Sequence, residues 1–235
     1  MTRLGDSRIV AQILHKLIAY HFGQNGEKRL LKIPATKSSI LLKFILKSSG
    51  IYAGLATAFS LIGIFPIFGE YLPKSYLIGN PLVVSGISIE HVVGHVVFGL
   101  IVGFVTFSIR YILVAGLFPI ALDSDHLVQF LNIDAVPRLG HSFLFGIISV
   151  PIMMYAIGKK DYRLGAISMA SVLTHISFDI LLSGKSGSQF PILIPVSNKM
   201  LMLIGQDWIF FLLAALIICA TGTFFAKNLT NKTQI

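Results

Sequence analysis

Long apolar runs separated by short polar stretches dominate the chain from about residue 51 onward. About 20 apolar residues are needed for a helix to cross the hydrocarbon core of a membrane. The pattern therefore predicts an all-α, polytopic transmembrane helical bundle with about five to six membrane segments. The predicted segments lie at residues 51–69, 83–108, 111–122, 140–158, 164–183 and 207–226. The third run is about twelve residues long, which indicates a half-helix or re-entrant piece and leaves the sidedness of later segments open.

The composition supports a membrane protein. Of 235 residues, 54% are hydrophobic and 12% are charged, and the mean hydropathy is +0.81. A soluble domain carries about a quarter charged residues, so this composition excludes an ordinary soluble protein and leaves no room for a large soluble module. The single cysteine, Cys219, lies within an apolar run, which excludes an intramolecular disulfide.

The first 50 residues differ from the rest because nine Lys and Arg residues accompany only Asp6 and Glu27. Apolar residues recur at helical spacing within residues 8–22, which predicts an amphipathic helix. This helix either lies on an anionic membrane leaflet or packs on its own protein. We expect three parts: a basic amphipathic arm (1–50), a membrane-embedded domain (51–227) and a short tail (228–235).

The distribution of Lys and Arg predicts the orientation, because cytoplasmic loops carry an excess of both. With six segments and a cytoplasmic N-terminus, the basic arm and one set of residues fall inside: Arg110, Lys159, Lys160, Arg163, Lys227 and Lys232. The smaller set that falls outside comprises Lys74, Arg138, Lys185 and Lys199. The sequence thus predicts an integral protein of the plasma or inner membrane with both termini in the cytoplasm.

Two pairs of polar residues interrupt the apolar runs at helical spacing. His91 and His95 are four residues apart, and His175 and Asp179 repeat that spacing. Residues at i and i+4 share one helix face, and histidine with carboxylate suits Zn or another divalent metal. An ionised carboxylate in a membrane helix costs roughly 2.5–3.5 kcal/mol, so it is tolerated where it is paired, hydrated or metal-bound.

Further metal-ligand side chains stand at the ends of neighbouring segments. Asp123, Asp125 and His126 follow the third run, and His141 begins the fourth. On the six-segment map all these residues fall at one membrane face, the extracytoplasmic one in the predicted orientation. We expect a metal site there, with ligands from His95, Asp123, Asp125, His126, His141, His175 and Asp179.

Other interpretations of these residues remain open. His91 suits a hydrogen bond between helices, or a contact that orients a metal ligand, as well as a ligand role. His175 and Asp179 could form a buried ion pair, and Asp123 could cap a helix while Asp125 faces water. Seven ligands exceed the three or four that one tetrahedral Zn uses, so either two ions bind or some residues serve as base or orienting groups. Ser142, directly after His141, is expected to cap a helix.

Five short motifs follow one another between about residues 90 and 200. They are Gly94-His95, Asp123-Ser124-Asp125-His126, Arg138-Leu139-Gly140-His141-Ser142, Thr174-His175-Ile176-Ser177-Phe178-Asp179 and Phe190-Pro191-Ile192-Leu193-Ile194-Pro195. In this order they resemble the YdjM-like family of inner-membrane proteins, described as membrane-bound metal-dependent hydrolases and in one case as LexA-binding. The chain departs from the family pattern in three ways: Arg138 lies three residues before His141 instead of four, Gly140 replaces a Thr, and Pro119 is displaced from Asp123. Residues 1–80 have no counterpart.

The resemblance implies a membrane-bound metal-dependent hydrolase. A more distant similarity to zinc-dependent phospholipase C and the zinc single-strand nucleases implies phosphoester chemistry. In the favoured mechanism one or more divalent ions, expected to be Zn, activate water, Asp123 or Asp125 takes its proton, and Arg138 stabilises charge on a phosphoryl oxygen. The expected partners are membrane lipids and a small phosphoester or phospholipid substrate, whereas nucleic acid is not expected.

Two other classes of function remain open. A metal or proton transporter would use the intramembrane His and Asp residues to line a pathway. A non-catalytic membrane adaptor would bind a regulator through its basic arm. A membrane metalloprotease is disfavoured because the sequence has no His-Glu-x-x-His motif.

Overall fold

The computed structural model describes residues 35–62, 76–77, 88–131, 135–136, 138–194 and 196–232. The chain divides into two compact units, Met1–Lys43 and Phe44–Ile235. Only the first turns of one helix are described in the first unit, and the amphipathic helix predicted within residues 8–22 lies outside the described residues. The second unit holds the helical bundle and the polar residues singled out by the sequence.

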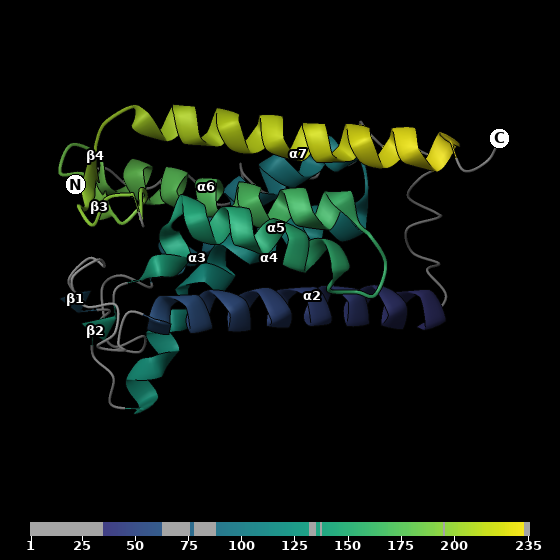
Figure 1. Cartoon of the computed structure of the whole chain (residues 1–235), viewed down its shortest axis with the longest axis horizontal. Coiled ribbons are helices and arrows are strands. Elements are labelled where there is room, and N and C mark those ends of the chain that lie inside the picture. The colour runs from purple at the N-terminus through teal and green to yellow at the C-terminus, as the bar shows by residue number, and fades with distance from the viewer. Residues whose placement is uncertain are drawn as a thin grey trace. The chain divides into compact units, whose positions relative to one another are not determined.

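Helices make up most of the described residues and confirm the predicted all-α membrane bundle (Figure 1). The α-helices are α2 (Ala35–Leu61), α3 (Ile89–Gly103), α4 (Ile109–Leu122), α5 (Phe143–Tyr155), α6 (Tyr162–Ser183) and α7 (Asp207–Lys232). Three 3-10 helices adjoin them: η3 (Phe104–Thr106), η4 (Asp123–Leu131) and η5 (Leu139–His141). Among the described residues, 5 helices are long and apolar enough to cross a membrane, and α5 is a shorter apolar helix.

The boundaries of two spans differ from the predicted segments. The first span, Ser39–Leu61, begins well before residue 51. Lys43 and Lys47 lower the local hydropathy there, although lysine stems can lie along an apolar helix surface. The third span, Ile109–Val128, is not a half-helix as expected, because η4 continues the helical path past the two aspartates. The short segment is α5 instead.

Helix α6 is the most buried helix, and α7 turns small residues inward and large apolar ones outward, as helices of membrane bundles do. Most of α6 is buried, because α3, α4, α5 and α7 all pack against it. Along α7, Ala215, Cys219 and Thr223 are buried, whereas Phe210 and Ile217 are 70% and 66% exposed. This arrangement places small side chains between helices and leaves large ones for lipid.

Consecutive helices run in alternate directions, so their ends meet in two groups. Ser60 Oγ, at the end of α2, accepts a 3.2 Å hydrogen bond from the Gly140 amide just before α5. Ser177 Oγ, near the end of α6, donates to the Trp208 carbonyl at the start of α7 over 2.7 Å. One end of the bundle therefore collects the C-terminal ends of α2, α4 and α6 and the N-terminal ends of α3, α5 and α7. We call it the polar end, because His91, Asp123 and the rest of the candidate ligands lie there.

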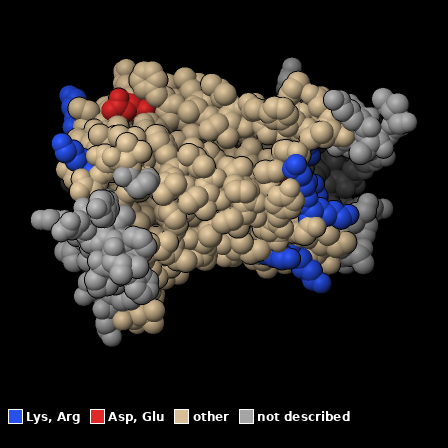
Figure 2. Space-filling model, in the orientation of Figure 1, with Lys and Arg blue, Asp and Glu red and all other residues tan. Residues whose placement is uncertain are grey.

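The opposite end is called the basic end. It contains the α3–α4 and α5–α6 connections and the C-terminal part of α7, with the cations Arg110, Lys159, Lys160, Arg163 and Lys227. On the face drawn in Figure 2, charged side chains lie toward these two ends and the band between them carries none. An uncharged band between charged ends is what a membrane-spanning bundle requires.

Two short strand pairs complete the described structure. β1 (Tyr76–Leu77) pairs antiparallel with β2 (Ala135–Val136), and β3 (Ser188–Phe190) pairs antiparallel with β4 (Leu201–Leu203). After β3 the chain turns so that the Ile192 carbonyl accepts a 3.0 Å hydrogen bond from the Phe143 amide at the start of α5. The apolar stretch after Phe190 is thus hydrogen-bonded to the start of α5, the helix that follows His141.

Candidate metal centre

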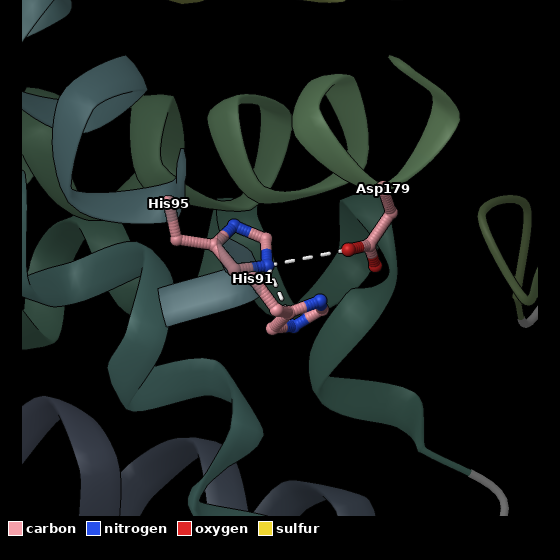
Figure 3. A group of neighbouring side chains, drawn as sticks. All are labelled: His91, His95 and Asp179. Atoms are coloured by element: carbon pink, nitrogen blue, oxygen red, sulfur yellow. Dashed lines mark hydrogen bonds and ion pairs between the residues drawn. The ribbon is translucent and has the colours of Figure 1, made fainter. Parts of the chain in front are cut away.

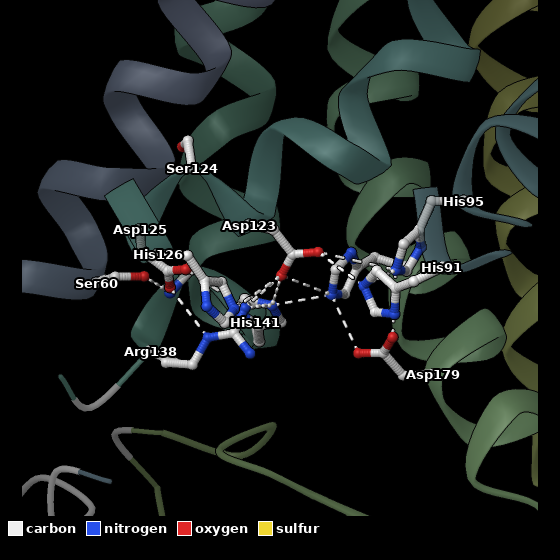
Figure 4. Close-up of polar contacts among 12 residues, drawn as sticks. Ser60, His91, His95, Asp123, Ser124, Asp125, His126, Arg138, His141 and Asp179 are labelled. Atoms are coloured by element: carbon white, nitrogen blue, oxygen red, sulfur yellow. Dashed lines mark hydrogen bonds and ion pairs between the residues drawn. The ribbon is translucent and has the colours of Figure 1, made fainter. Parts of the chain in front are cut away.

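Five of the seven histidines converge at the polar end through the same ring atom, Nε2 (Figure 4). They come from four separate elements, α3, η4, η5 and α6, and surround the Asp123 carboxylate. The group comprises His91, His95, His126, His141 and His175. We call these histidines, with Asp123, Asp125, Arg138 and Asp179, the polar cluster.

Helix α3 presents His91 and His95 on one face, as their spacing predicts. Ser88 caps the helix by accepting a hydrogen bond from the His91 amide, 3.1 Å. The two Nε2 atoms lie 3.0 Å apart. Gly94 allows α3 to lie close to α6, since a Cβ at this position would overlap the ring of Phe178 on α6. The close contact between α3 and α6 lets the rings of His95 and His175 stack with centroids 4.1 Å apart.

Asp123 lies at the centre of the cluster, and its two carboxylate oxygens face different histidines. Its Oδ2 lies 3.1 Å from His91 Nε2 and 3.9 Å from His95 Nε2. Its Oδ1 lies 3.6–3.7 Å from the Nε2 atoms of the other three, His126, His141 and His175. A carboxylate placed this way can bridge two cation positions, one on each oxygen.

The backbone of α4 fixes the orientation of His175. Helix α4 ends at Asp123, whose amide bonds to the carbonyls of Ala121 and Ile120. The Pro119 carbonyl is therefore left for His175 Nδ1, which lies 2.8 Å away. A carbonyl only accepts, so Nδ1 carries a proton, and Nε2 is the ring atom that faces the cluster. Metal-bound histidines are oriented in this way.

Asp179 lies one turn after His175 and joins α6 to α3 (Figure 3). Its Oδ2 is 3.1 Å from His175 Nε2, and its Oδ1 is 3.2 Å from His95 Nε2. The i, i+4 pair seen in the sequence thus also reaches a third residue on another helix. The contact goes beyond an isolated ion pair within α6.

Arg138 supplies the one guanidinium of the polar cluster. Its Nη2 donates to Asp123 Oδ1 and, over 2.8 Å, to His141 Nε2, while its Nε donates to Asp125 Oδ2 over 3.1 Å. Its backbone is left-handed, with φ 49°, which costs about 1 kcal/mol or more for a residue other than glycine. A cation held in a strained conformation against two carboxylates is typical of a functional position.

His141 lies in η5, which is anchored from both sides. Gly140 bonds to Ser60 on α2, and Ser142 caps α5 by accepting from the Phe145 amide, 3.1 Å, which confirms its predicted capping role. Burial, together with the Arg138 guanidinium, lowers the pKa of His141 to about 4. Its ring is therefore neutral near pH 7, which agrees with its Nε2 accepting from Arg138 Nη2.

His141 and His175 bring two Nε2 atoms within 3.0 Å of each other. His141 Nε2 accepts from Arg138 Nη2, and His175 Nε2 faces the carboxylates of Asp123 and Asp179. Imidazole with carboxylate is the donor set that Zn prefers.

Three overlapping groups of described residues bring their ligand atoms within 4.8 Å of one another. They are His91 with His95 and Asp179, His95 with Asp123 and His175, and Asp123 with Asp125 and His126. The first and third groups share no residue, and Asp123 of the third group contacts His91 of the first. The geometry therefore offers ligands for two ions as readily as for one.

The structure brings together all seven predicted ligands and the predicted catalytic Arg138, although their ligand and catalytic roles stay predictions. His91, which the sequence left open, contacts both His95 and Asp123. Sequence reasoning missed Ser60 and the Pro119 carbonyl, which position η5 and His175. No sequence signal identifies a backbone carbonyl released at a helix end.

The chain matches no family model, no curated protein and no solved structure. The resemblance to the YdjM-like inner-membrane proteins therefore stays a prediction, and the proposals below depend on the geometry.

Proposed function

We propose that this protein is a membrane-embedded, divalent-metal-dependent hydrolase that acts on a phosphoester, with a lipid headgroup phosphoester as its substrate. One observation carries the proposal: five imidazole Nε2 atoms and three carboxylates from four elements meet at one end of a bundle of apolar helices. Polar side chains buried in a membrane bundle are costly, and those that are retained mark functional sites.

The donor set fits one or two divalent ions, for which Zn is the expected metal. His91, His95 and Asp179 would hold one ion, and Asp123, His126 and His141 would hold a second, with His175 beside both Asp123 and Asp179. A bound divalent ion supplies Lewis acidity, which lowers the pKa of water toward neutrality and polarises a phosphoryl oxygen.

The remaining steps fall to side chains of the cluster. Asp123 is surrounded by histidines, whereas Asp125 contacts the Arg138 guanidinium and is completely buried. We assign Asp123 to cation binding and Asp125 to accepting the proton of the attacking water. Arg138 is 12% exposed at its side chain, and its guanidinium would stabilise the phosphoryl oxygen on which charge develops.

A lipid is the favoured substrate because of the side chains that follow the ligands. Directly after His126, Leu127, Phe130 and Leu131 are 54%, 59% and 71% exposed, while Val128 is buried. Large apolar side chains at the rim of a polar cluster suit a substrate with an acyl region and a charged headgroup. The Lys and Arg distribution of the sequence supports an extracytoplasmic position for this end.

The buried hydroxyl groups outside the cluster weigh against a transport pathway. Ser171 Oγ and Thr174 Oγ1 each donate over 2.7 Å to a carbonyl one turn earlier in α6. Thr223 of α7 bonds to its own helix in the same way. These hydroxyls are already satisfied locally, so they do not offer free ligands that continue toward the basic end.

The proposal is tested by turnover of the purified full chain in lipid nanodiscs. The substrates are a phospholipid and a water-soluble phosphodiester, each with and without a chelator. We expect chelator-sensitive cleavage of the phospholipid, at least tenfold lower in Asp125→Asn. The matched control is Ser124→Ala, because Ser124 Oγ faces α2, 2.6 Å from Thr57 Oγ1. Cleavage that survives both the chelator and Asp125→Asn, or no cleavage of either substrate by metal-loaded protein, contradicts it.

A further inference from the structure

The basic end carries a cluster of cations that the proposed hydrolase does not use. It is defined by Arg110, Lys159, Lys160, Arg163 and Lys227, all in the second unit. Among the described residues, every ion pair lies in the polar cluster, and none involves these cations. The described residues of the basic end therefore carry an excess of positive over negative charge.

The nearest carboxylate, Asp161, is fully engaged in structural contacts. Its Oδ1 accepts hydrogen bonds from the amides of Arg163 and Leu164, both 3.1 Å, and so caps α6. Its Oδ2 accepts from the Tyr111 hydroxyl over 2.7 Å. None of these contacts is an ion pair with Arg110 or Arg163.

Tyr111 holds those two arginines in fixed positions. The guanidinium carbon of Arg110 lies 4.4 Å from the centroid of the Tyr111 ring, and that of Arg163 lies 5.4 Å from it. Arg110 Nη2 also donates to the Tyr111 hydroxyl. Arg163 Nε is buried and bonds to no described residue. Two guanidinium groups held beside one aromatic ring suit a phosphate group, which accepts from several N–H groups at once.

The position of these arginines along the bundle indicates where the phosphate comes from. Arg110 is the second residue of the span Ile109–Val128, and Arg163 is the second residue of Tyr162–Ser183. Phe107 and Tyr155, at the same end, are 75% and 56% exposed. Arginines at span ends beside exposed aromatic rings lie at the level of lipid headgroups.

We propose that the basic end binds the headgroup phosphate of an anionic phospholipid, with Arg110 and Arg163 as its direct contacts and the three lysines as surrounding charge. In Figure 2, the Lys and Arg side chains on the right of the face shown have no acidic side chain beside them. This site is separate from the polar cluster and binds lipid without cleaving it. It holds whether or not the protein is a hydrolase.

The test is native mass spectrometry of the full chain in detergent, with phosphatidylglycerol or phosphatidylcholine added at equal concentration. We expect selective binding of phosphatidylglycerol, about 30-fold weaker in Arg110→Gln/Arg163→Gln, roughly fivefold for each arginine. The charge-preserving Arg110→Lys/Arg163→Lys should bind with an affinity between those of wild type and the Gln variant, because lysine keeps the charge but loses the paired N–H donors of the guanidinium. This variant separates loss of charge from loss of fold. The matched control is Lys185→Gln/Lys199→Gln, which removes two exposed cations from the polar end.

The basic N-terminal residues are unchanged in all these variants, so they do not contribute to the differences. Equal affinity of the wild-type chain for the two lipids overturns the proposal, as does an equal loss in the control variant. Inorganic phosphate in millimolar excess is a third arm. If it displaces the lipid completely, the site binds free phosphate and the assignment to lipid is wrong.

Discussion

The two ends of the helical bundle deal with polar side chains in opposite ways. At the polar end, carboxylates and imidazoles contact one another and meet in one buried cluster around Asp123. At the basic end, Arg110 and Arg163 contact an aromatic ring and leave their charge uncompensated. Between the ends, hydroxyl groups such as that of Ser171 bond to their own helix.

The difference indicates what each end can bind. A cluster rich in lone pairs and carboxylate charge attracts cations, whereas uncompensated guanidinium groups attract anions. The helices between them supply packing without a continuous polar path. Substitutions at each level of the bundle should therefore have different consequences.

The largest effect is expected for Arg138→Gln. If Arg138 stabilises charge on the phosphoryl oxygen, turnover should fall by about 10²–10³-fold, as for loss of one donor from an oxyanion hole. Metal content should stay the same or rise, because the guanidinium shares Asp123 Oδ1 with the proposed ion. Turnover and elemental analysis on the same preparation test this. Loss of metal would show that Arg138 builds the site and has no separate role in the chemistry.

A smaller effect is expected for His91→Ala. His91 is 13% exposed at its side chain and contacts both His95 and Asp123, so its loss removes one ligand and leaves the rest. We expect metal affinity to fall by about 10–100-fold, measured by competition with a chelating dye. The control is Val92→Ala on the next position of α3. Unchanged affinity in His91→Ala would assign His91 to helix contact alone.

Gly94→Ala tests the approach of α3 to α6. The added Cβ would overlap the ring of Phe178 and force it to move. Overpacking of this kind costs about 1–3 kcal/mol, which should appear as a lower unfolding midpoint in mixed SDS micelles. Gly54→Ala is the matched control, since a Cβ at that position meets nothing within 4 Å. Equal midpoints for the two variants would show that α3 and α6 are not packed as described.

The smallest effect is expected for Ser171→Ala in the middle of α6. The hydrogen bond that is lost joins Ser171 to the backbone of its own helix. The free energy of unfolding should therefore change by less than about 0.6 kcal/mol, the average contribution of a hydrogen bond between membrane helices. Metal content and turnover should not change. A large fall in metal flux through proteoliposomes for this variant would favour the transporter.

Much of the fold follows from the sequence, because a membrane bundle is specified by apolar runs of sufficient length. The i, i+4 pairs of His91 with His95 and of His175 with Asp179 also indicate which residues share a helix face. The sequence predicts the ends of a helix poorly where polar residues interrupt an apolar run. Asp123 and Asp125 end the apolar run without ending the helical path, so the length of the third span was mistaken.

The sequence predicted which residues gather at the site better than it predicted which of their atoms are in contact. Alternating spans place the ends of even and odd segments together, which is why the cluster could be expected at one face. Which atoms meet depends on backbone features that leave no pattern in the sequence. The left-handed conformation of Arg138 and the released Pro119 carbonyl are two of them.

The most direct test of the central claim is the metal content of the purified full chain. Wild type is compared with Asp123→Ala and His175→Ala, and with Ser124→Ala as the control that faces α2. A divalent-metal centre predicts about one or two ions per chain in wild type and Ser124→Ala. It predicts loss of most of that metal in Asp123→Ala and His175→Ala. The same small, substoichiometric amount of metal in all four proteins would contradict it.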